Sequence, residues 1–342
     1  MFGTAHQIIA NRLEELSKNG DPLLKLNKVM DWNIFMPLLN WTFKKEKKTR
    51  SGRKHYPLLI MFKILILQSL YNLSDQQTEY QIRDRLSFMR FLGLQIQDQV
   101  PDEKTIWLFR EKLIKADIIE KLFQKFNSYL NEEGYAAAIG TMIDASIVST
   151  PKQRNSRDDN QVIKEGDIPA SFTENKNKLR QKDIDARWTK KNHQNYYGYK
   201  NHIGVDVKYK IIRNYVVTPA NMSDIHCLDA LLNSDNPDKK IWADSAYFSA
   251  EKEQQLQEKG YESRIISRNK KHLGQWTDKA RENTRRSKTR VRVEHVFGFI
   301  ANTIGARIIR GVGIARMTAK LGLINLVYNF SRFEQLNRLG VA

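Results

Sequence analysis

The sequence has one cysteine, Cys227, in 342 residues, which excludes an internal disulfide and zinc sites built from cysteine pairs. A chain of this length buries a core without disulfides, and we expect Cys227 to be a buried apolar side chain in a reducing, cytoplasmic setting. Long apolar runs are also missing. The longest, 58–67, is interrupted by Lys63 and is far shorter than the roughly 20 residues that span a bilayer. Residues 1–12 lack the charged start and apolar stretch of a secretory signal. We therefore expect neither a membrane protein nor a secreted one.

Acidic residues are scarce, with 38 Asp and Glu against 57 Lys and Arg, and the formal net charge is +19. Such an excess repels itself in a compact protein unless the partner is a polyanion, of which nucleic acid is the commonest. A basic enzyme without such a partner is the alternative. The hydrophobic content of 41% indicates a globular chain rather than a basic disordered one. Most of the excess charge lies after residue 136.

Residues 1–135 read as a helical N-terminal domain. Ser74 is a good N-cap, and Asp102 and Glu103 open a further helix. The stretch 74–115 fits either a DNA-binding helix-turn-helix or an ordinary helical bundle. Ahead of it, 44–54 reads either as a flexible basic arm that follows a phosphate backbone or as a solvated linker. The cations of this arm are Lys44, Lys45, Lys47, Lys48, Arg50, Arg53 and Lys54.

Residues 136–342 have a different texture, with β-rich runs that later alternate with helices. A first strand near 139–148 and a hairpin at 201–218 precede short strands at 240–243 and 261–267, each of which follows a helix. This order predicts a mixed β-sheet flanked by helices, of α+β or α/β class. The stretch of about 151–195 is polar and reads as an insertion or mobile loop. A long helix at 281–301 and an amphipathic one at 318–337 follow.

Three acids occur in apolar surroundings. Asp144 lies inside the first strand, Asp244 directly follows a short strand, and Glu294 lies in an apolar helical stretch. Each alone is more often a cap or an ion-pair partner. Together, converging carboxylates repel each other unless a divalent cation neutralises them, and Mg²⁺ or Mn²⁺ prefers such oxygen ligands. Two such ions can promote phosphodiester cleavage. The run 268–292, with ten Lys and Arg, would hold a polyanion beside this site.

These motifs resemble the DDE triad of bacterial insertion-sequence transposases, most closely the insertion sequence five family. The resemblance covers roughly residues 55–335. Besides Asp144, it is carried by 56–63, 86–94, 197–206, 217–221, 244–248 and 290–298. It implies a ribonuclease H-like catalytic domain over 136–342, with Asp144, Asp244 and Glu294 binding two Mg²⁺ (or Mn²⁺) ions. It also implies a DNA transposase that cleaves the element ends and transfers the 3′-hydroxyl strand into target DNA.

The resemblance further implies double-stranded DNA as partner, a homodimer in the synaptic complex, and association with the bacterial nucleoid. Arg290 matches the arginine of a wider Tyr-Arg-Glu-Lys signature. Ser287 and Ala301 stand where that signature has tyrosine and lysine, so Arg286, Arg292 or Arg307 would have to substitute in gripping the phosphates. The DNA-binding candidates of this half are Arg285, Arg286, Arg290, Arg292 and Trp276, the last as a stacking residue.

Some alternatives remain open from the sequence. Asp206 is also a strand acid, and with His202 it could belong to a different metal cluster, although alternation places both on one face of their strand. The same triad also fits a metal-dependent DNA nuclease without strand transfer. A domesticated, non-catalytic DNA-binding protein is a further reading, but such a protein would be free to lose acids of the triad.

Overall fold

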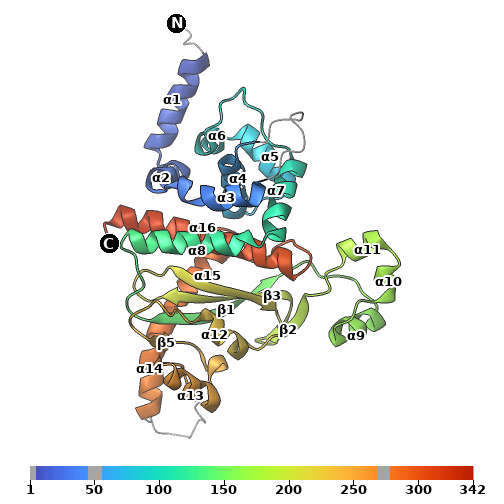
Figure 1. The fold of residues 1–342 in the computed structure, drawn as a ribbon, viewed down its shortest axis with the longest axis vertical. Coiled ribbons are helices and arrows are strands. Elements are labelled where there is room, and N and C mark those ends of the chain that lie inside the picture. Colours follow the sequence, from blue (N-terminus) through green and yellow to red (C-terminus); the bar gives the residue numbers. More distant parts are fainter. Residues whose placement is uncertain (1–4, 45–55, 268–277, 342) are drawn as a thin grey trace. The chain divides into compact units, whose positions relative to one another are not determined.

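The computed structural model describes residues 5–44, 56–267 and 278–341 (Figure 1). The chain divides into two compact units, one formed by Met1–Gly134 with Leu326–Ala342 and the other by Tyr135–Asn325. The second domain expected from sequence extended to residue 342, whereas residues 326–342 group with the helical unit. The reason lies in the packing of the last helix, where Phe330 lies 4.6 Å and Phe333 6.0 Å from Phe126, between ring centroids.

The first unit is helical in its described residues. Its helices are α1 (Ala5–Lys18), α2 (Pro22–Val29), α3 (Met36–Phe43), α4 (Leu58–Leu70), α5 (Asp75–Asp84), α6 (Leu86–Leu92), α7 (Glu103–Lys115), α8 (Ile118–Glu132) and the C-terminal part of α16 (Ile314–Leu339). Ser74 caps α5 by accepting from the backbone N–H of Gln77, and Asp102 caps α7. No single described helix is long and apolar enough to cross a membrane. Helices α4 and α5 pass that test only as a pair bent by 104°.

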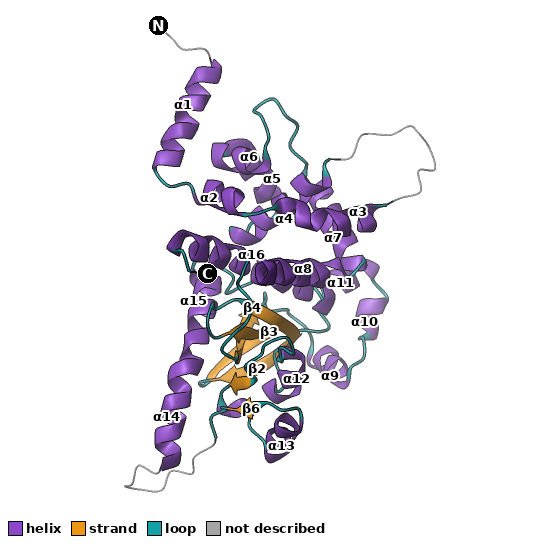
Figure 2. Ribbon diagram, turned by 60° about the vertical axis from the view of Figure 1, so that its left-hand side comes forward, coloured by secondary structure: helices purple, strands orange, loops and turns teal. Residues whose placement is uncertain are grey.

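The second unit contains a six-stranded sheet, drawn in orange in Figure 2. Its strands are β1 (Thr141–Ser149), β2 (Arg187–Lys191), β3 (Gln194–Asp206), β4 (Ile212–Pro219), β5 (Lys240–Trp242) and β6 (Glu262–Ser263). Strands β1, β3 and β4 are antiparallel neighbours, while β5 and β6 add to the other side of β1 in parallel. The sheet is thus mixed and flanked by helices, as the sequence predicts for the second half of the chain.

Helices cover both faces of this sheet. On one face Ile143 and Ile241 pack with residues of α12 (Leu228–Leu231) and α13 (Ala250–Glu258) in one buried cluster. On the other face lie α14 (Asp278–Arg290) and α15 (Glu294–Asn302), where Phe297 and Ile300 approach β1. The single helix expected at 281–301 is therefore two helices separated by a 3-10 turn, Val291–Val293, and the second begins at Glu294.

The polar stretch of about 151–195 is folded rather than a loop. It contains α9 (Arg157–Glu165), α10 (Ala170–Thr173), α11 (Lys176–Gln181) and strand β2. Two apolar anchors, Ile163 and Phe172, are buried. The buried Asp183 carboxylate accepts hydrogen bonds from the Tyr199 hydroxyl at 2.7 and 2.8 Å, which ties the end of this stretch to β3. Few apolar anchors left an insertion and a mobile loop both open from the sequence, and the structure has a folded insertion that buried hydrogen bonds also hold.

Candidate active site

Two of the predicted acids belong to neighbouring parallel strands, with Asp144 inside β1 and Asp244 two residues after the end of β5. Strands β1 and β5 pair directly at Met142 and Trp242. Asp144 and Asp244 each follow this pair by two residues, so the register brings them together at the carboxyl end of β5. The charge of Asp244 acts on the Asp144 carboxyl. The Asp244 carboxylate also accepts the backbone N–H of Ala246 at 2.8 Å, which holds the start of the following 3-10 turn.

Asp144 is a mostly buried carboxyl whose negative charge is only partly offset by hydrogen bonds and nearby cations. Its side chain is 15% exposed, and Oδ1 accepts the backbone N–H of Ala145 at 2.8 Å. Burial raises the pKa of Asp144 to about 6, and the negative charge of Asp244 adds to this rise. The Ala145 N–H, the Arg290 guanidinium and the Lys191 ammonium oppose it. The site therefore favours additional positive charge next to Asp144.

Arg290 links Asp144 to the third predicted acid. Its Nη1 lies 2.8 Å from Oδ2 of Asp144, and its Nη2 lies 2.8 Å from Oε1 of Glu294. The Arg290 side chain is 17% exposed, whereas that of Glu294 is 57% exposed. Its apolar sequence neighbours suggested a buried carboxylate, but the Glu294 side chain is largely exposed. Glu294 is the first residue of α15, a helix labelled in Figure 1, and the Arg290 guanidinium links it to Asp144.

The donor set fits a hard divalent cation, although the acids are not arranged around one. Within residues 5–44, 56–267 and 278–341, no group of three or more His, Cys, Asp or Glu is placed to hold a metal ion. Asp144 and Asp244 nevertheless offer adjacent carboxylates, and Asp144 has the raised pKa of a carboxyl that lacks a full counter-charge. The Arg290 guanidinium supplies part of that positive charge.

Asp206 and His202 lie on the wrong face for this cluster. Asp144 pairs with Ile203, while His202 pairs with Ala145 and Asp206 pairs with Thr141. Because paired residues share a face and faces alternate along a strand, both side chains point away from Asp144.

Asp206 and His202 make hydrogen bonds of their own on the face opposite Asp144. The buried Asp206 carboxylate accepts backbone N–H groups of Lys208, Tyr209 and Ile211, so it shapes the turn between β3 and β4. The His202 Nε2 lies 2.8 Å from the Thr218 hydroxyl, and burial lowers the pKa of His202 to about 4.

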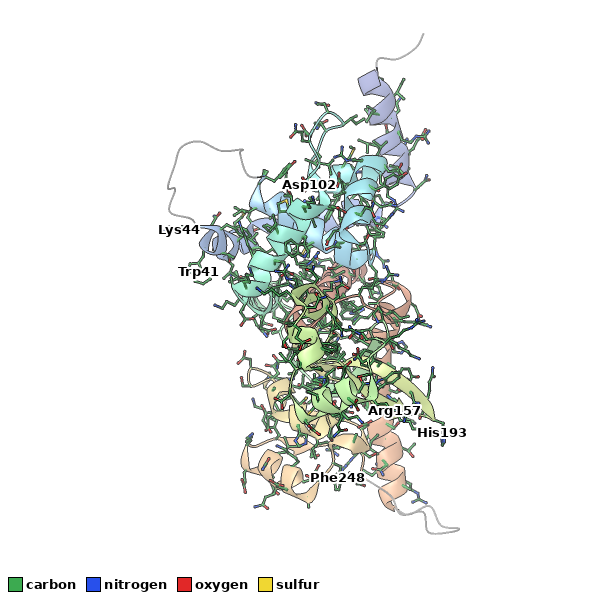
Figure 3. The ribbon with its side chains drawn as sticks, turned by 90° about the vertical axis from the view of Figure 1, so that its right-hand side faces the viewer. Trp41, Lys44, Asp102, Arg157, His193 and Phe248 are labelled. Carbon is green, nitrogen blue, oxygen red and sulfur yellow. The ribbon has the colours of Figure 1, made fainter. Side chains whose placement is uncertain are left out.

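The predicted DNA-binding cations differ in their placement. Lys44, labelled in Figure 3, directly follows α3, and Arg285 is exposed on α14. Arg286 donates to the Ile265 carbonyl and Arg292 to the Val207 carbonyl, so part of each guanidinium is used internally. Outside the described residues lie Lys45, Lys47, Lys48, Arg50, Arg53, Lys54 and Trp276.

Two further residues act on the acids and are not among the predicted site residues. Tyr247 is fully buried, and its hydroxyl has no hydrogen-bond partner in the described part of the chain. Burial raises the pKa of Tyr247, and the charges of Asp224, Asp144 and Asp244 raise it further. Lys191, in β2, acts on Asp144 from a segment that was expected to be a loop. Only the position of Tyr247, three residues after Asp244, gave a signal in the sequence.

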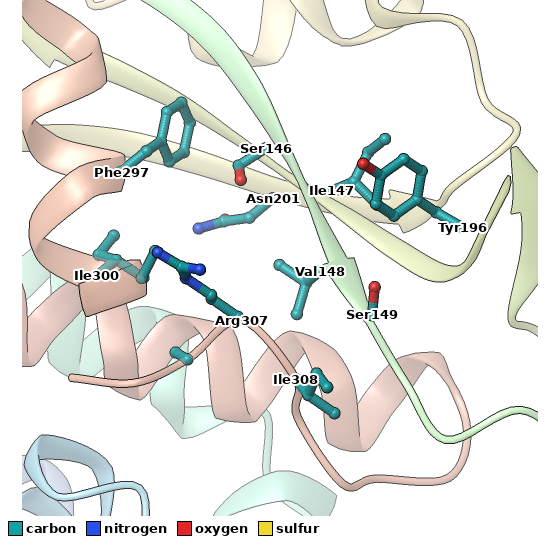
Figure 4. A pocket seen from close by; sticks show the side chains of 12 residues that line it. Ser146, Ile147, Val148, Ser149, Tyr196, Asn201, Phe297, Ile300, Arg307 and Ile308 are labelled. Carbon is teal, nitrogen blue, oxygen red and sulfur yellow. The ribbon is translucent and has the colours of Figure 1, made fainter. Parts of the chain in front are cut away.

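A pocket of about 330 Å³ lies along the C-terminal half of β1, which also carries Asp144 (Figure 4). Ser146, two residues after Asp144 on β1, lines it together with Asn201, Phe297 and Arg307. Its lining also includes Tyr196, from the N-terminal part of β3. A ligand-sized space with polar and apolar walls thus begins two residues beyond Asp144 along β1.

Comparison with known proteins gives matches over both parts of the chain. A family model described as a transposase DDE domain matches residues 136–330, more than half of the chain. A second, described as a transposase domain (DUF772), matches residues 11–112. Among solved structures, the cryo-EM structure of a piggyBac transposase synaptic complex with hairpin DNA aligns with 93% of this chain and 76% of that chain. The sequence identity is 11% and the TM-score is 0.47.

Proposed function

Because this chain belongs to the family of transposases with a DDE domain, we propose that it cuts the two ends of an insertion sequence and joins the freed 3′-hydroxyls to target DNA. The observation that carries this proposal is that the pairing of β1 with β5 brings Asp144 and Asp244 together, within the range matched by the DDE model. The motifs 244–248 and 290–298 support assignment to the insertion sequence five family.

Asp144, Asp244 and Glu294 are the side chains that would hold the divalent cations, Mg²⁺ or Mn²⁺, with two ions in the proposed site. Bound there, such ions activate an attacking oxygen and stabilise the leaving one. Asp144 and Asp244 orient the site, because backbone N–H groups of Ala145 and Ala246 already fix their carboxylates. Glu294 would join them as a ligand once its carboxylate leaves Arg290 and binds a cation.

Two displacements make up the proposed reaction. In the first, a water oxygen bonds to the scissile phosphorus, the bond to the 3′-oxygen breaks, and a 3′-hydroxyl and a 5′-phosphate result. In the second, that 3′-oxygen bonds to a target phosphorus and displaces a 3′-oxygen of the target. The cationic surface of α14, with exposed Arg285, supports a role in holding the DNA backbone during both steps.

The test uses a plasmid that carries the gene with its flanking DNA, together with a second plasmid as target. We expect the wild-type protein to produce cut ends and joined products with Mg²⁺ or Mn²⁺, and neither in EDTA. Asp144→Asn, Asp244→Asn and Glu294→Gln should abolish both products while DNA binding persists. Asp158→Asn is the matched control, since Asp158 is exposed on α9. Full cleavage by Asp244→Asn would overturn the assignment, and cut ends without joined products would make the protein a nuclease.

The proposed partners are double-stranded DNA, as element ends and as target, and a second copy of this chain. Strand transfer of an element requires both of its ends at one place, which a homodimer in a synaptic complex provides. The helical unit and the arm 44–54 are proposed to bind the element ends, in association with the bacterial nucleoid. Native mass measured with and without end-bearing DNA tests the dimer, and a monomer-sized complex on paired ends would refute it.

A further inference from the structure

Strands β2 and β3 form a tight, cationic hairpin beside the active site. Asn192 and His193 join the strands with φ values of 50° and 64°, so both turn residues are left-handed. A two-residue turn of this kind matches the twist of the strands and fixes their register, here with Lys191 opposite Gln194. The hairpin is therefore a shaped element, with His193 at its outer end in Figure 3.

The hairpin has two different faces. Trp188 and Lys190 share one face with their cross-strand partners, and Trp188 is 49% exposed. Thr189 and Lys191 share the other face with their partners Tyr196 and Gln194. We call the second set, Thr189, Lys191, Gln194 and Tyr196, the inner face.

Two observations connect the inner face with the surroundings of Asp144. The positive charge of Lys191 acts on the Asp144 carboxyl, and Tyr196 lines the pocket that Ser146 and Arg307 also line (Figure 4). Lys190, the neighbouring cation on the other face, does neither.

The root of the hairpin is tightly fixed against β1. Gly198, with φ 151°, passes so close to β1 that a Cβ atom would lie 2.3 Å from the Val148 carbonyl oxygen. The backbone N–H of Thr150 donates to the Tyr197 carbonyl at 2.9 Å on the same side. This contact sets the direction in which the hairpin leaves the sheet.

The chemistry of the inner face fits a phosphodiester strand. No Asp or Glu occurs from residue 187 to residue 205, so the hairpin offers cations and neutral polar groups. Lys191 is exposed and has no ion pair with any described carboxylate other than its longer-range effect on Asp144. A lysine ammonium can bind a phosphate group as a point charge, and an aromatic side chain can stack on a neighbouring base.

We propose that the inner face of the β2–β3 hairpin binds the DNA strand next to the scissile phosphate, with Lys191 on a backbone phosphate and Tyr196 against the adjoining nucleotide. This inference rests on the proposed function, because it takes the DNA bound for cleavage as its ligand. Lys191 and Tyr196 are positioning residues here, since no group of theirs takes part in the displacement.

The first experiment is lysine footprinting on the wild-type protein. The protein is acetylated with and without a fluorescent random-sequence DNA duplex in EDTA, and modification at each lysine is read by tandem mass spectrometry. We expect DNA to protect Lys191 several-fold and to leave Lys190 nearly unchanged. The two residues lie in one peptide with equal charge, so Lys190 is an internal control. Equal reactivity of Lys191 with and without DNA would overturn the proposal.

The second experiment measures the salt dependence of binding to the same duplex by fluorescence anisotropy. Loss of one phosphate contact reduces the slope of log K against log salt by about 1. Lys191→Gln should show this reduction and Lys190→Gln should not. Identical slopes for both variants and the wild type would refute the hairpin contact. Because these readouts need no cleavage, they stand apart from the proposed function, which fails if the wild-type protein cuts no DNA.

Discussion

Asp144→Asn should make the metal-free protein more stable at alkaline pH. Burial raises the pKa of Asp144 from 3.8 to about 6, so the folded state holds the proton more tightly than the unfolded state. The stabilising contribution of Asp144 is therefore fully present below pH 3.8 and is lost as the pH rises through about 6. Above that pH the folded protein carries a poorly compensated carboxylate, which asparagine replaces with a neutral group of similar shape.

The magnitude follows from the same pKa. A change from 3.8 to about 6, at roughly 1.4 kcal/mol per pKa unit, corresponds to about 3 kcal/mol. The side chain is 15% exposed, so solvent screening removes only part of this value. Asparagine also loses the charge-assisted contact with Arg290, and we expect a net gain of about 1–3 kcal/mol at pH 8. For a unit of roughly 150–250 residues, each kcal/mol moves Tm by about 2–4 °C.

The assay is thermal and urea unfolding in EDTA at pH 4 and pH 8 for the wild type, Asp144→Asn and the exposed control Asp158→Asn. We expect the advantage of Asp144→Asn at pH 8 to vanish near pH 4, and the control to stay within about 0.5 kcal/mol at both. Mg²⁺ at pH 8 should stabilise the wild type more than Asp144→Asn. A variant that is less stable than the wild type at pH 8, or equally shifted at both pH values, would refute this reasoning.

Further predictions concern packing around the site. Tyr247→Phe should raise the free energy of unfolding by about 1 kcal/mol in urea titrations, because the buried hydroxyl it removes has no partner among the described residues. Gly204→Ala should lower it by more than about 2 kcal/mol, since the new Cβ would lie 2.5 Å from the Leu231 carbonyl oxygen. Gly298→Ala, in open space on α15, should instead add about 0.5–1 kcal/mol, and an equal loss at both glycines would contradict this reasoning. Asp206→Ala should cost about 3–5 kcal/mol by circular dichroism melts, because it leaves Arg213 buried without its carboxylate, and a cost under about 1 kcal/mol would argue against that role.

The order of elements was predictable because its signals are local. Apolar runs with turn residues marked β1, the β3–β4 hairpin and β5, and Ser74 and Asp102 marked helix starts. Local sequence signals did not predict the elements whose formation depends on contacts with distant parts of the chain. Strand β2 and helix α9 lie in a polar stretch, and they form because Phe172 is buried and Asp183 bonds to Tyr199 on β3. The break before Glu294 was missed because the helical pattern of 281–301 continues through it.

The sequence by itself determined which acids to consider. Asp144 occurs inside an apolar strand, and Asp244 directly follows the end of another. Only the tertiary structure decided what surrounds them. The hydrogen bond from Arg290 to Asp144 joins residues 146 positions apart, and the face of Asp206 follows from the pairing of β1 with β3. A one-residue change of register would reverse every such assignment, since side chains alternate along a strand. The effect of Lys191 on Asp144 likewise depends on the direction in which β3 extends beyond β1 at Gly198. Sequence periodicity does not encode this direction.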